Sequence, residues 1–123
     1  MIRIVLADDN PGFRRALRRL LEREGDMTIV AEVGDGEVAV ATAVELAPDV
    51  VVMDLAMPGL NGLDASNDIR RLNPGIAVLL LSVGETAGPD AATEAGVGAH
   101  LFKGVPASEI VSAVRSLSLA HRA

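Results

Sequence analysis

The feature that most constrains this chain is a regular alternation between two kinds of segment. Five short stretches are rich in β-branched and other apolar residues and are bounded by Gly, Pro, Asp or Asn, which is typical of β-strands. The first, third and fourth are almost continuously apolar, as expected of parallel strands that are covered on both faces. The five stretches are IRIVLA at 2–7, MTIVAEV at 27–33, VVVMD at 50–54, IAVLLLS at 76–82 and AHLFK at 99–103.

A segment with helical character follows each predicted strand. In 12–24, apolar residues recur at the spacing of one helix face, and 107–121 repeats that spacing. Segment 63–72 shows the pattern more thinly. Segment 36–47 could also alternate as a strand, but its length and the proline that follows it favour a helix.

The fourth helix is the weakest prediction. Segment 89–95 offers only Ala91, Ala92 and Ala95 for an inner face, and these bury little apolar area. We therefore expect residues 84–98 to be the most mobile part of the chain, with faster hydrogen exchange than the first and fifth helices.

A βα unit that occurs five times predicts the α/β class, with a parallel five-stranded sheet between two layers of helices. The 123 residues, half of them apolar, are about the size of one domain, which we place at 1–123. In such sheets, functional groups gather at the carboxyl ends of the strands.

Composition excludes several functions. Seventeen acidic against eleven basic residues give a net charge of −6, which argues against direct binding of nucleic acid by this chain. Cysteine is absent, so disulfides, zinc–cysteine sites and thiol chemistry are excluded. There is no apolar run of membrane-spanning length and no signal-peptide pattern, so we expect no membrane association and a cytoplasmic location.

Polar residues stand at the ends of four predicted strands: Asp8 and Asp9, Asp54, Ser82 and Lys103. Three carboxylates at one sheet edge repel one another unless a cation compensates, and an all-oxygen ligand set selects a hard ion such as Mg²⁺. A metal, a lysine and a hydroxyl around one carboxylate would hold a phosphoryl group. An aspartate in that position can act as the nucleophile and carry the phosphoryl as an acyl phosphate.

Each of these residues also has a simpler explanation when taken singly. An Asp pair after a strand often only caps a helix, Asp54 could merely begin a loop, and a lysine at a strand end is usually a solvated charge. The combination is harder to explain by coincidence, because a suitable residue type stands at every relevant strand end.

The chain resembles the receiver domain of two-component response regulators over essentially its whole length. The motifs that carry the resemblance are LADDN at 6–10, VVMDLAMPGLNGLD at 51–64, LLLS at 79–82 and GAHLFKGVP at 98–106. The resemblance implies a flavodoxin-like fold with strand order 2-1-3-4-5. The segment around the fifth strand is most similar to the branch that carries a C-terminal helix-turn-helix output domain.

The resemblance also implies roles for the acidic residues. Asp54 would accept a phosphoryl group from a sensor histidine kinase or a phosphotransfer protein. Asp9 would ligate Mg²⁺ directly and Asp8 mainly through water, while the main-chain carbonyl of Ala56 and the Asp54 carboxylate complete the protein ligands. The protein would catalyse only its own phosphorylation and dephosphorylation, so it would be a switch and not an enzyme that turns over substrates.

Further expectations from the resemblance concern the fourth and fifth strands. Ser82 and Lys103 would hold phosphoryl oxygens, and His100 stands at the position of the family's switch aromatic, with its ring expected near the fourth and fifth helices. Phosphorylation would change the face formed by helix four, strand five and helix five, which would control an output domain or downstream protein and could form a homodimer. Gly104 follows the lysine where many receivers have a cis-proline, so no cis bond is expected.

Three alternatives compete with this interpretation. GDGEVA at 34–39 matches the dinucleotide-binding pattern G-x-G-x-x-A, but Asp35 and Glu37 would oppose a pyrophosphate. A dehalogenase-type phosphatase needs a second Asp where Ala56 stands, so that reading fails. A receiver-like interaction module that works without phosphorylation remains open.

The first predicted helix carries the only concentration of basic residues: Arg14, Arg15, Arg18, Arg19 and Arg23. They could form a solvated face tempered by Glu22 and Glu24, or they could dock the phosphohistidine-bearing donor.

Overall fold

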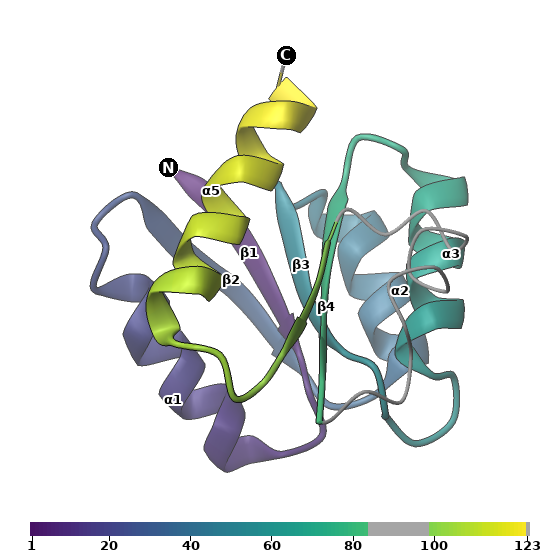
Figure 1. Ribbon diagram of the computed structural model, residues 1–123. Coiled ribbons are helices and arrows are strands. Elements are labelled where there is room, and N and C mark those ends of the chain that lie inside the picture. The colour runs from purple at the N-terminus through teal and green to yellow at the C-terminus, as the bar shows by residue number, and fades with distance from the viewer. Residues whose placement is uncertain (84–98, 123) are drawn as a thin grey trace.

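A parallel sheet forms the centre of the computed structural model, which describes residues 1–83 and 99–122. The sheet order is β2-β1-β3-β4-β5, and every neighbouring pair is parallel (Figure 1). The order and the parallel pairing confirm the predicted flavodoxin-like fold. The strands are β1 (Ile2–Ala7), β2 (Met27–Val33), β3 (Val50–Asp54), β4 (Ala77–Ser82) and β5 (Ala99–Phe102).

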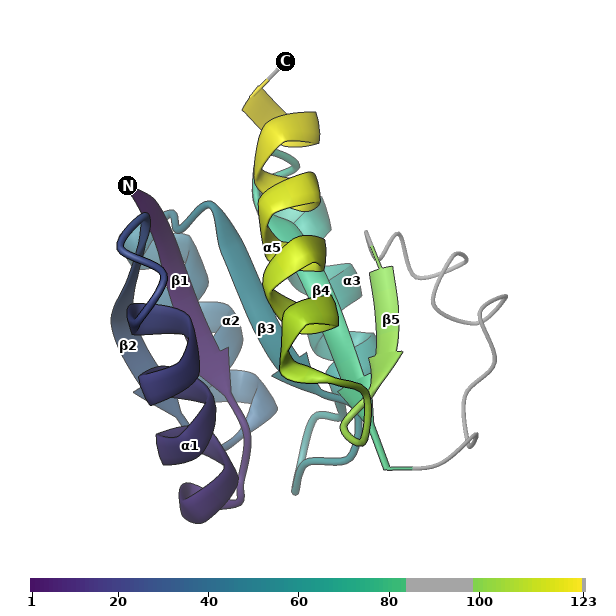
Figure 2. The ribbon, with the colours of Figure 1, turned by 60° about the vertical axis from the view of Figure 1, so that its left-hand side comes forward.

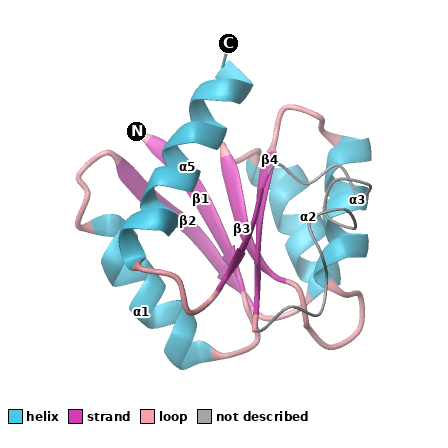
Figure 3. Cartoon of the chain, in the orientation of Figure 1, coloured by secondary structure: helices cyan, strands magenta, loops and turns pink. Residues whose placement is uncertain are grey.

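Helices cover both faces of this sheet. The helices α1 and α5 lie on one face and α2 and α3 on the other (Figures 1 and 3), which gives the predicted three layers. Figure 2 shows α5 running across the sheet, with β5 at the edge beside β4. The helix bounds are α1 (Pro11–Glu22), α2 (Gly36–Leu46), α3 (Gly62–Leu72) and α5 (Ala107–Arg122).

Two apolar cores lie on opposite faces of the sheet. In β1, Ile4 and Leu6 join the core beneath α1 and α5, whereas Val5 and Ala7 join the core beneath α2 and α3. This division follows from the two-residue period of a strand, whose successive side chains point to opposite faces. Because both faces are covered, a central strand must be apolar along its length, and Val50–Asp54 is buried throughout.

The predicted elements that fall within the described residues are confirmed, with shifts of one or two residues at their ends. The stretch 36–47, which could have alternated as a strand, contains the helix α2, which ends where Ala47 adopts a φ of 47°. The helix α1 begins at Pro11 because the Asn10 side chain accepts a hydrogen bond from the Phe13 N–H. The expected fourth helix at 89–95 and the expected mobility of 84–98 lie outside the described residues.

Two other expectations concern the backbone and the membrane. Residues 1–83 and 99–122 contain no cis peptide bond, in line with the expectation for Gly104. Within the same residues, every helix is too short or too polar to cross a bilayer.

Gly62, at the start of α3, lets this helix approach the end of β3 closely. A Cβ at this position would collide with the Asp54 carbonyl oxygen and would lie 2.8 Å from the Leu55 Cα. The Gly62 N–H donates to the Leu55 carbonyl oxygen at 2.8 Å, so the two segments are also bonded to each other. The absence of a side chain at 62 therefore allows α3 to begin directly against the Asp54 backbone.

We predict that Gly62→Ala destabilises the fold by about 1–3 kcal/mol, the usual cost of forcing extra volume into a packed site. Urea denaturation measures this change in the free energy of unfolding. Gly104→Ala is the matched control, because a Cβ at 104 would meet no atom within 4 Å. Equal stability of the two variants would contradict the close-approach explanation.

Candidate functional site

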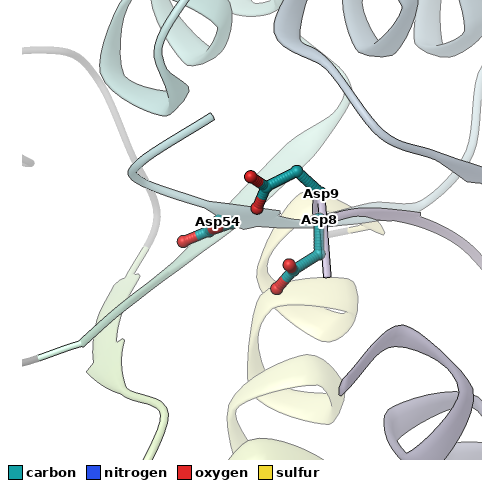
Figure 4. Close-up of side chains that lie close together, drawn as sticks. All are labelled: Asp8, Asp9 and Asp54. Atoms are coloured by element: carbon teal, nitrogen blue, oxygen red, sulfur yellow. The ribbon is translucent and has the colours of Figure 1, made fainter. Parts of the chain in front are cut away.

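The carboxyl ends of β1 and β3 bring three acidic side chains together. Asp8 and Asp9 directly follow β1, and Asp54 is the last residue of the neighbouring strand β3. One carboxylate oxygen from each lies within 4.8 Å of the other two (Figure 4). Asp8 and Asp54 are buried, whereas Asp9 is exposed. The parallel sheet thus assembles the acidic cluster that the strand ends predict.

Main-chain hydrogen bonds hold these strand ends in place. The Asp8 N–H donates to the Val33 carbonyl at 3.0 Å, and the Leu55 N–H donates to the Leu81 carbonyl at 2.8 Å. The Asp8 Oδ1 accepts a hydrogen bond from the Asn10 N–H at 2.8 Å. These bonds therefore tie the segments that follow β1 and β3 to the neighbouring strands β2 and β4.

Lys103 supplies the opposing charge. Its Nζ lies 2.7 Å from Asp8 Oδ2 and 3.5 Å from Asp54 Oδ2. The same ammonium group lies 4.3 Å from the centre of the Phe13 ring on α1, a cation–π contact that sequence reasoning missed. The Lys103 N–H donates to the Ser82 carbonyl at 2.9 Å, which places the lysine beside the end of β4. One cation thus partly offsets three carboxylates.

Ser82 and His100 contact each other across β4 and β5. The Ser82 Oγ and the His100 Nε2 are 2.8 Å apart, and Ser82 is buried. The His100 ring also packs against Phe102 edge-on, with ring centres 5.9 Å apart. The alternation of β5 and the adjacency of the two strands produce this contact, which the sequence interpretation did not anticipate.

A cavity of about 400 Å³ opens at this sheet edge. Its lining includes five of the predicted site residues. The other two are outside the lining but contact residues in it: Asp8 pairs with Lys103, and His100 contacts Ser82. The lining residues are Asp9, Asn10, Asp54, Leu55, Ala56, Ser82, Val83 and Lys103. The volume is sufficient for a hydrated cation and a phosphoryl group.

Burial raises the pKa of the Asp54 carboxyl above its ordinary value, and the neighbouring Asp8 carboxylate raises it further. The Lys103 ammonium and a hydrogen bond from the Ala56 N–H to Asp54 Oδ1, at 3.3 Å, act in the opposite direction. The net effect is that ionised Asp54 is disfavoured at this position. A cation beside Asp54 would relieve that cost.

The donor set fits a hard cation. The cluster offers three carboxylates whose oxygens lie close together, and Ala56, with its main-chain carbonyl, lines the same cavity. Oxygen ligands of this kind are the ones that Mg²⁺ prefers. No histidine or cysteine belongs to the cluster that the described residues form.

The arginines of α1 divide into two groups. Arg14 and Arg18 both pair with Glu32 on β2, at 3.2 and 2.6 Å, and Arg14 also donates to the Asp8 carbonyl. Arg15 and Arg19 remain exposed. The donor-docking alternative therefore concerns Arg15 and Arg19. If it holds, reversing both to Glu should slow transfer from a histidine kinase and leave phosphorylation by acetyl phosphate unchanged, whereas equal loss with both donors would favour the solvated face.

The dinucleotide interpretation loses its structural basis. The Asp35 side chain accepts the Val38 N–H at 2.8 Å and caps α2, so it uses the helix N-terminus that a pyrophosphate would need. A Cβ at Gly36 would collide with the Leu60 carbonyl, so this glycine serves close packing of α2 against the loop before α3.

Comparisons with known proteins agree with this geometry. The family model described as "Response regulator receiver domain" matches residues 4–115. The chain is 37% identical over 123 residues to the response regulator UvrY of Escherichia coli K12, covering 99% of this chain and 56% of the relative. It is 38% identical over 119 residues to the transcriptional regulatory protein LiaR of Bacillus subtilis, covering 96% of this chain and 56% of LiaR.

A solved structure of similar fold is the two-component response regulator of the LuxR family from Aurantimonas sp. SI85-9A1. The TM-score is 0.91 at 34% identity, with 96% of this chain and 85% of that chain covered. The chain spans about half the length of the two curated relatives.

We predict that Asp54→Asn is more stable than the wild type at pH 7 in magnesium-free buffer. The raised pKa means that the folded state disfavours the ionised carboxylate, so a neutral amide removes a destabilising charge. As the pH falls through the raised pKa toward the ordinary Asp value of about 4, the wild type becomes protonated and the difference should close.

Urea denaturation of both proteins across this pH range measures the difference. Asp64→Asn, at an exposed position on α3, is the matched control and should not be more stable than the wild type at pH 7. A wild type as stable as Asp54→Asn at pH 7 would contradict the inferred cost of the buried charge.

Proposed function

This chain belongs to the family of response regulator receiver domains, and we propose from this premise that it is a signalling switch in which Asp54 accepts a phosphoryl group. The observation that carries the proposal is the position of Asp54: a buried carboxylate in a cavity, within reach of the acidic pair Asp8 and Asp9 and of Lys103. Residues 1–123 would form the receiver unit.

In the proposed reaction, a carboxylate oxygen of Asp54 attacks the phosphorus of the donor. The P–O or P–N bond to the leaving group breaks as the acyl phosphate forms, and the leaving group keeps the electron pair. Lys103 Nζ, 3.5 Å from Asp54 Oδ2, would bind a phosphoryl oxygen and stabilise the charge that moves during transfer. The Ser82 hydroxyl would contact another phosphoryl oxygen.

The acidic pair would hold Mg²⁺, which would supply positive charge that offsets the carboxylates and the incoming phosphoryl group. Asp9 lines the cavity and would ligate directly, with the Asp54 carboxylate and the Ala56 carbonyl. Asp8 would act mainly through water. Both Asp8 carboxylate oxygens already have partners, Lys103 Nζ and the Asn10 N–H, which supports an indirect role for Asp8 and a direct one for Asp9.

The proposed donor is a sensor histidine kinase or a phosphotransfer protein. The proposed recipient of the signal is an output domain or a separate downstream protein, and LiaR, whose name describes a transcriptional regulatory protein, supports transcription as the output. The signal would pass through the face made by the fourth helix, β5 and α5, which could also support a homodimer. A cytoplasmic location would suit these partners.

The competing proposal is a receiver-fold interaction module that works without phosphorylation. Nothing among the site residues favours it, since each position holds a side chain able to perform its proposed role. Phosphorylation of Asp54 separates the two functions, because only the switch requires it.

We predict that acetyl phosphate and Mg²⁺ add one phosphoryl group to the wild type and that EDTA prevents the addition. Without the cation, an anionic donor would have to approach three carboxylates. Intact-mass spectrometry measures the reaction. Asp54→Asn should remain unlabelled, whereas the control Asp64→Asn should be labelled as the wild type is.

Two further variants divide the roles of the acidic pair. Asp9→Ala should reduce the labelling rate severely because it removes a direct ligand, and Asp8→Ala should reduce it less. Labelling of Asp54→Asn at the wild-type rate would move the nucleophile elsewhere. Equal loss in the two alanine variants would contradict only the division of ligand roles.

For the proposed switch role of His100, we predict that its ring environment changes when Asp54 is phosphorylated. A phosphoryl oxygen that engages the Ser82 hydroxyl would compete with the 2.8 Å contact to His100 Nε2. Imidazole NMR signals of the free and phosphorylated forms measure the change, with His121 as the internal comparison. A His100 signal that does not move would contradict the switch role.

A further inference from the structure

Arg14 has a contact with the acidic cluster that differs from that of Lys103. Its Nη1 donates to the main-chain carbonyl of Asp8 at 2.6 Å, whereas Lys103 engages an Asp8 carboxylate oxygen. The arginine therefore touches the cluster without occupying a carboxylate oxygen that a cation could use. Arg14 is about a fifth exposed, so this hydrogen bond is partly shielded from water.

The Asp8 carbonyl belongs to the peptide unit that leads into Asp9. Because a peptide unit is planar, fixing its carbonyl also fixes the direction in which the Asp9 Cα leaves it. The Asp8 N–H is already bonded to the Val33 carbonyl, so the Arg14 contact holds the remaining polar group of the Asp8 backbone. The main chain before Asp9 is thus restrained on both sides.

Asp9 depends on this backbone restraint more than the other two carboxylates of the cluster do. Asp8 is held by Lys103 and the Asn10 N–H, and Asp54 by the Ala56 N–H. Within residues 1–83 and 99–122, no hydrogen bond or ion pair is formed by the Asp9 carboxylate, which is exposed. Its position beside Asp54 (Figure 4) therefore follows from the backbone that carries it.

Arg14 is itself oriented by Glu32 on β2. Glu32 Oε1 accepts from Arg14 Nε at 3.2 Å, while its Oε2 accepts from Arg18 Nη1 at 2.6 Å. The hydrogen bond from Arg18 and then that from Arg14 lower the pKa of Glu32, so the carboxylate stays ionised at neutral pH. One planar guanidinium thus joins α1, β2 and the segment after β1, a geometry that a lysine cannot reproduce.

We propose that Arg14 is a positioning residue for the cation site, which holds Asp9 in place through the main-chain carbonyl of Asp8. The inference rests on the proposed function, because the cation it concerns is the Mg²⁺ that the acidic cluster would hold. Arg14 lies outside the cavity lining, on a helix face that the sequence analysis assigned to solvent or to donor docking.

The sign of the effect on Mg²⁺ affinity separates positioning from simple charge. Arg14 is a cation close to a cation site, so by Coulomb's law alone its removal should tighten Mg²⁺ binding. If Arg14 positions Asp9, its removal should weaken binding, by about tenfold if it resembles other residues that orient metal ligands. The two explanations therefore predict changes in opposite directions.

The experiment is isothermal titration calorimetry of the whole chain with MgCl₂, without any phosphodonor. Arg14→Met should raise the Kd about tenfold, and Arg14→Lys, which keeps the charge, should raise it as well. The matched control is Arg18→Met, which removes the same charge from the same Glu32 without touching Asp8 and should leave the Kd unchanged or lower. Thermal denaturation in EDTA identifies any variant that does not fold, in which case the other Arg14 variant decides.

An unchanged or lower Kd in the folded Arg14 variants would overturn the positioning role, as would an equal rise in Arg18→Met. If the wild type binds Mg²⁺ but Asp54 is not phosphorylated, the proposed function fails while the Kd values still decide the role of Arg14. A wild type that binds no Mg²⁺ would overturn the inference together with the proposed cation site.

Discussion

The repulsion among three carboxylates is the constraint on which the functional part of this structure depends. Asp8, Asp9 and Asp54 have oxygens within 4.8 Å of one another, and the part of the cluster nearest the sheet is buried. Lys103 offsets part of this charge, but burial and the Asp8 carboxylate still raise the pKa of Asp54. The ionised form of Asp54 is therefore disfavoured unless a further cation binds. Because this repulsion lowers the stability of the folded protein, binding of a cation that relieves it is favoured.

The scaffold must be rigid for that preference to persist. Flexible acidic side chains would simply move apart, but here Asp54 ends a strand that is buried throughout and Asp8 is bonded to β2 through its backbone. Gly62 allows α3 to pack directly against the Asp54 backbone. The same close packing that excludes a side chain at 62 thus keeps the Asp54 carboxylate in a position that disfavours its charge, a cost that the two apolar cores offset.

The sequence predicted the sheet and the acidic cluster for the same reason. Apolar strand segments and the helices between them require a parallel sheet, and a parallel sheet brings Asp8, Asp54 and Lys103 to one edge regardless of side-chain detail. Contacts that depend on how helices and rotamers pack were beyond this reasoning. Arg14 belongs to the polar face of α1 by periodicity, and only the packing of α1 beside β2 brings it to the Asp8 carbonyl. The cation–π contact of Phe13 with Lys103 and the pairing of His100 with Ser82 arise in the same way.

The central claim is that the Asp54 carboxylate itself carries the phosphoryl group, and chemical mapping tests it most directly. Borohydride reduces an aspartyl phosphate to homoserine, so treatment of the phosphorylated protein followed by peptide mass spectrometry locates the modified residue. We predict homoserine at position 54 and intact aspartate at positions 8, 9 and 64. Homoserine at another position, or none after phosphorylation, would contradict the claim.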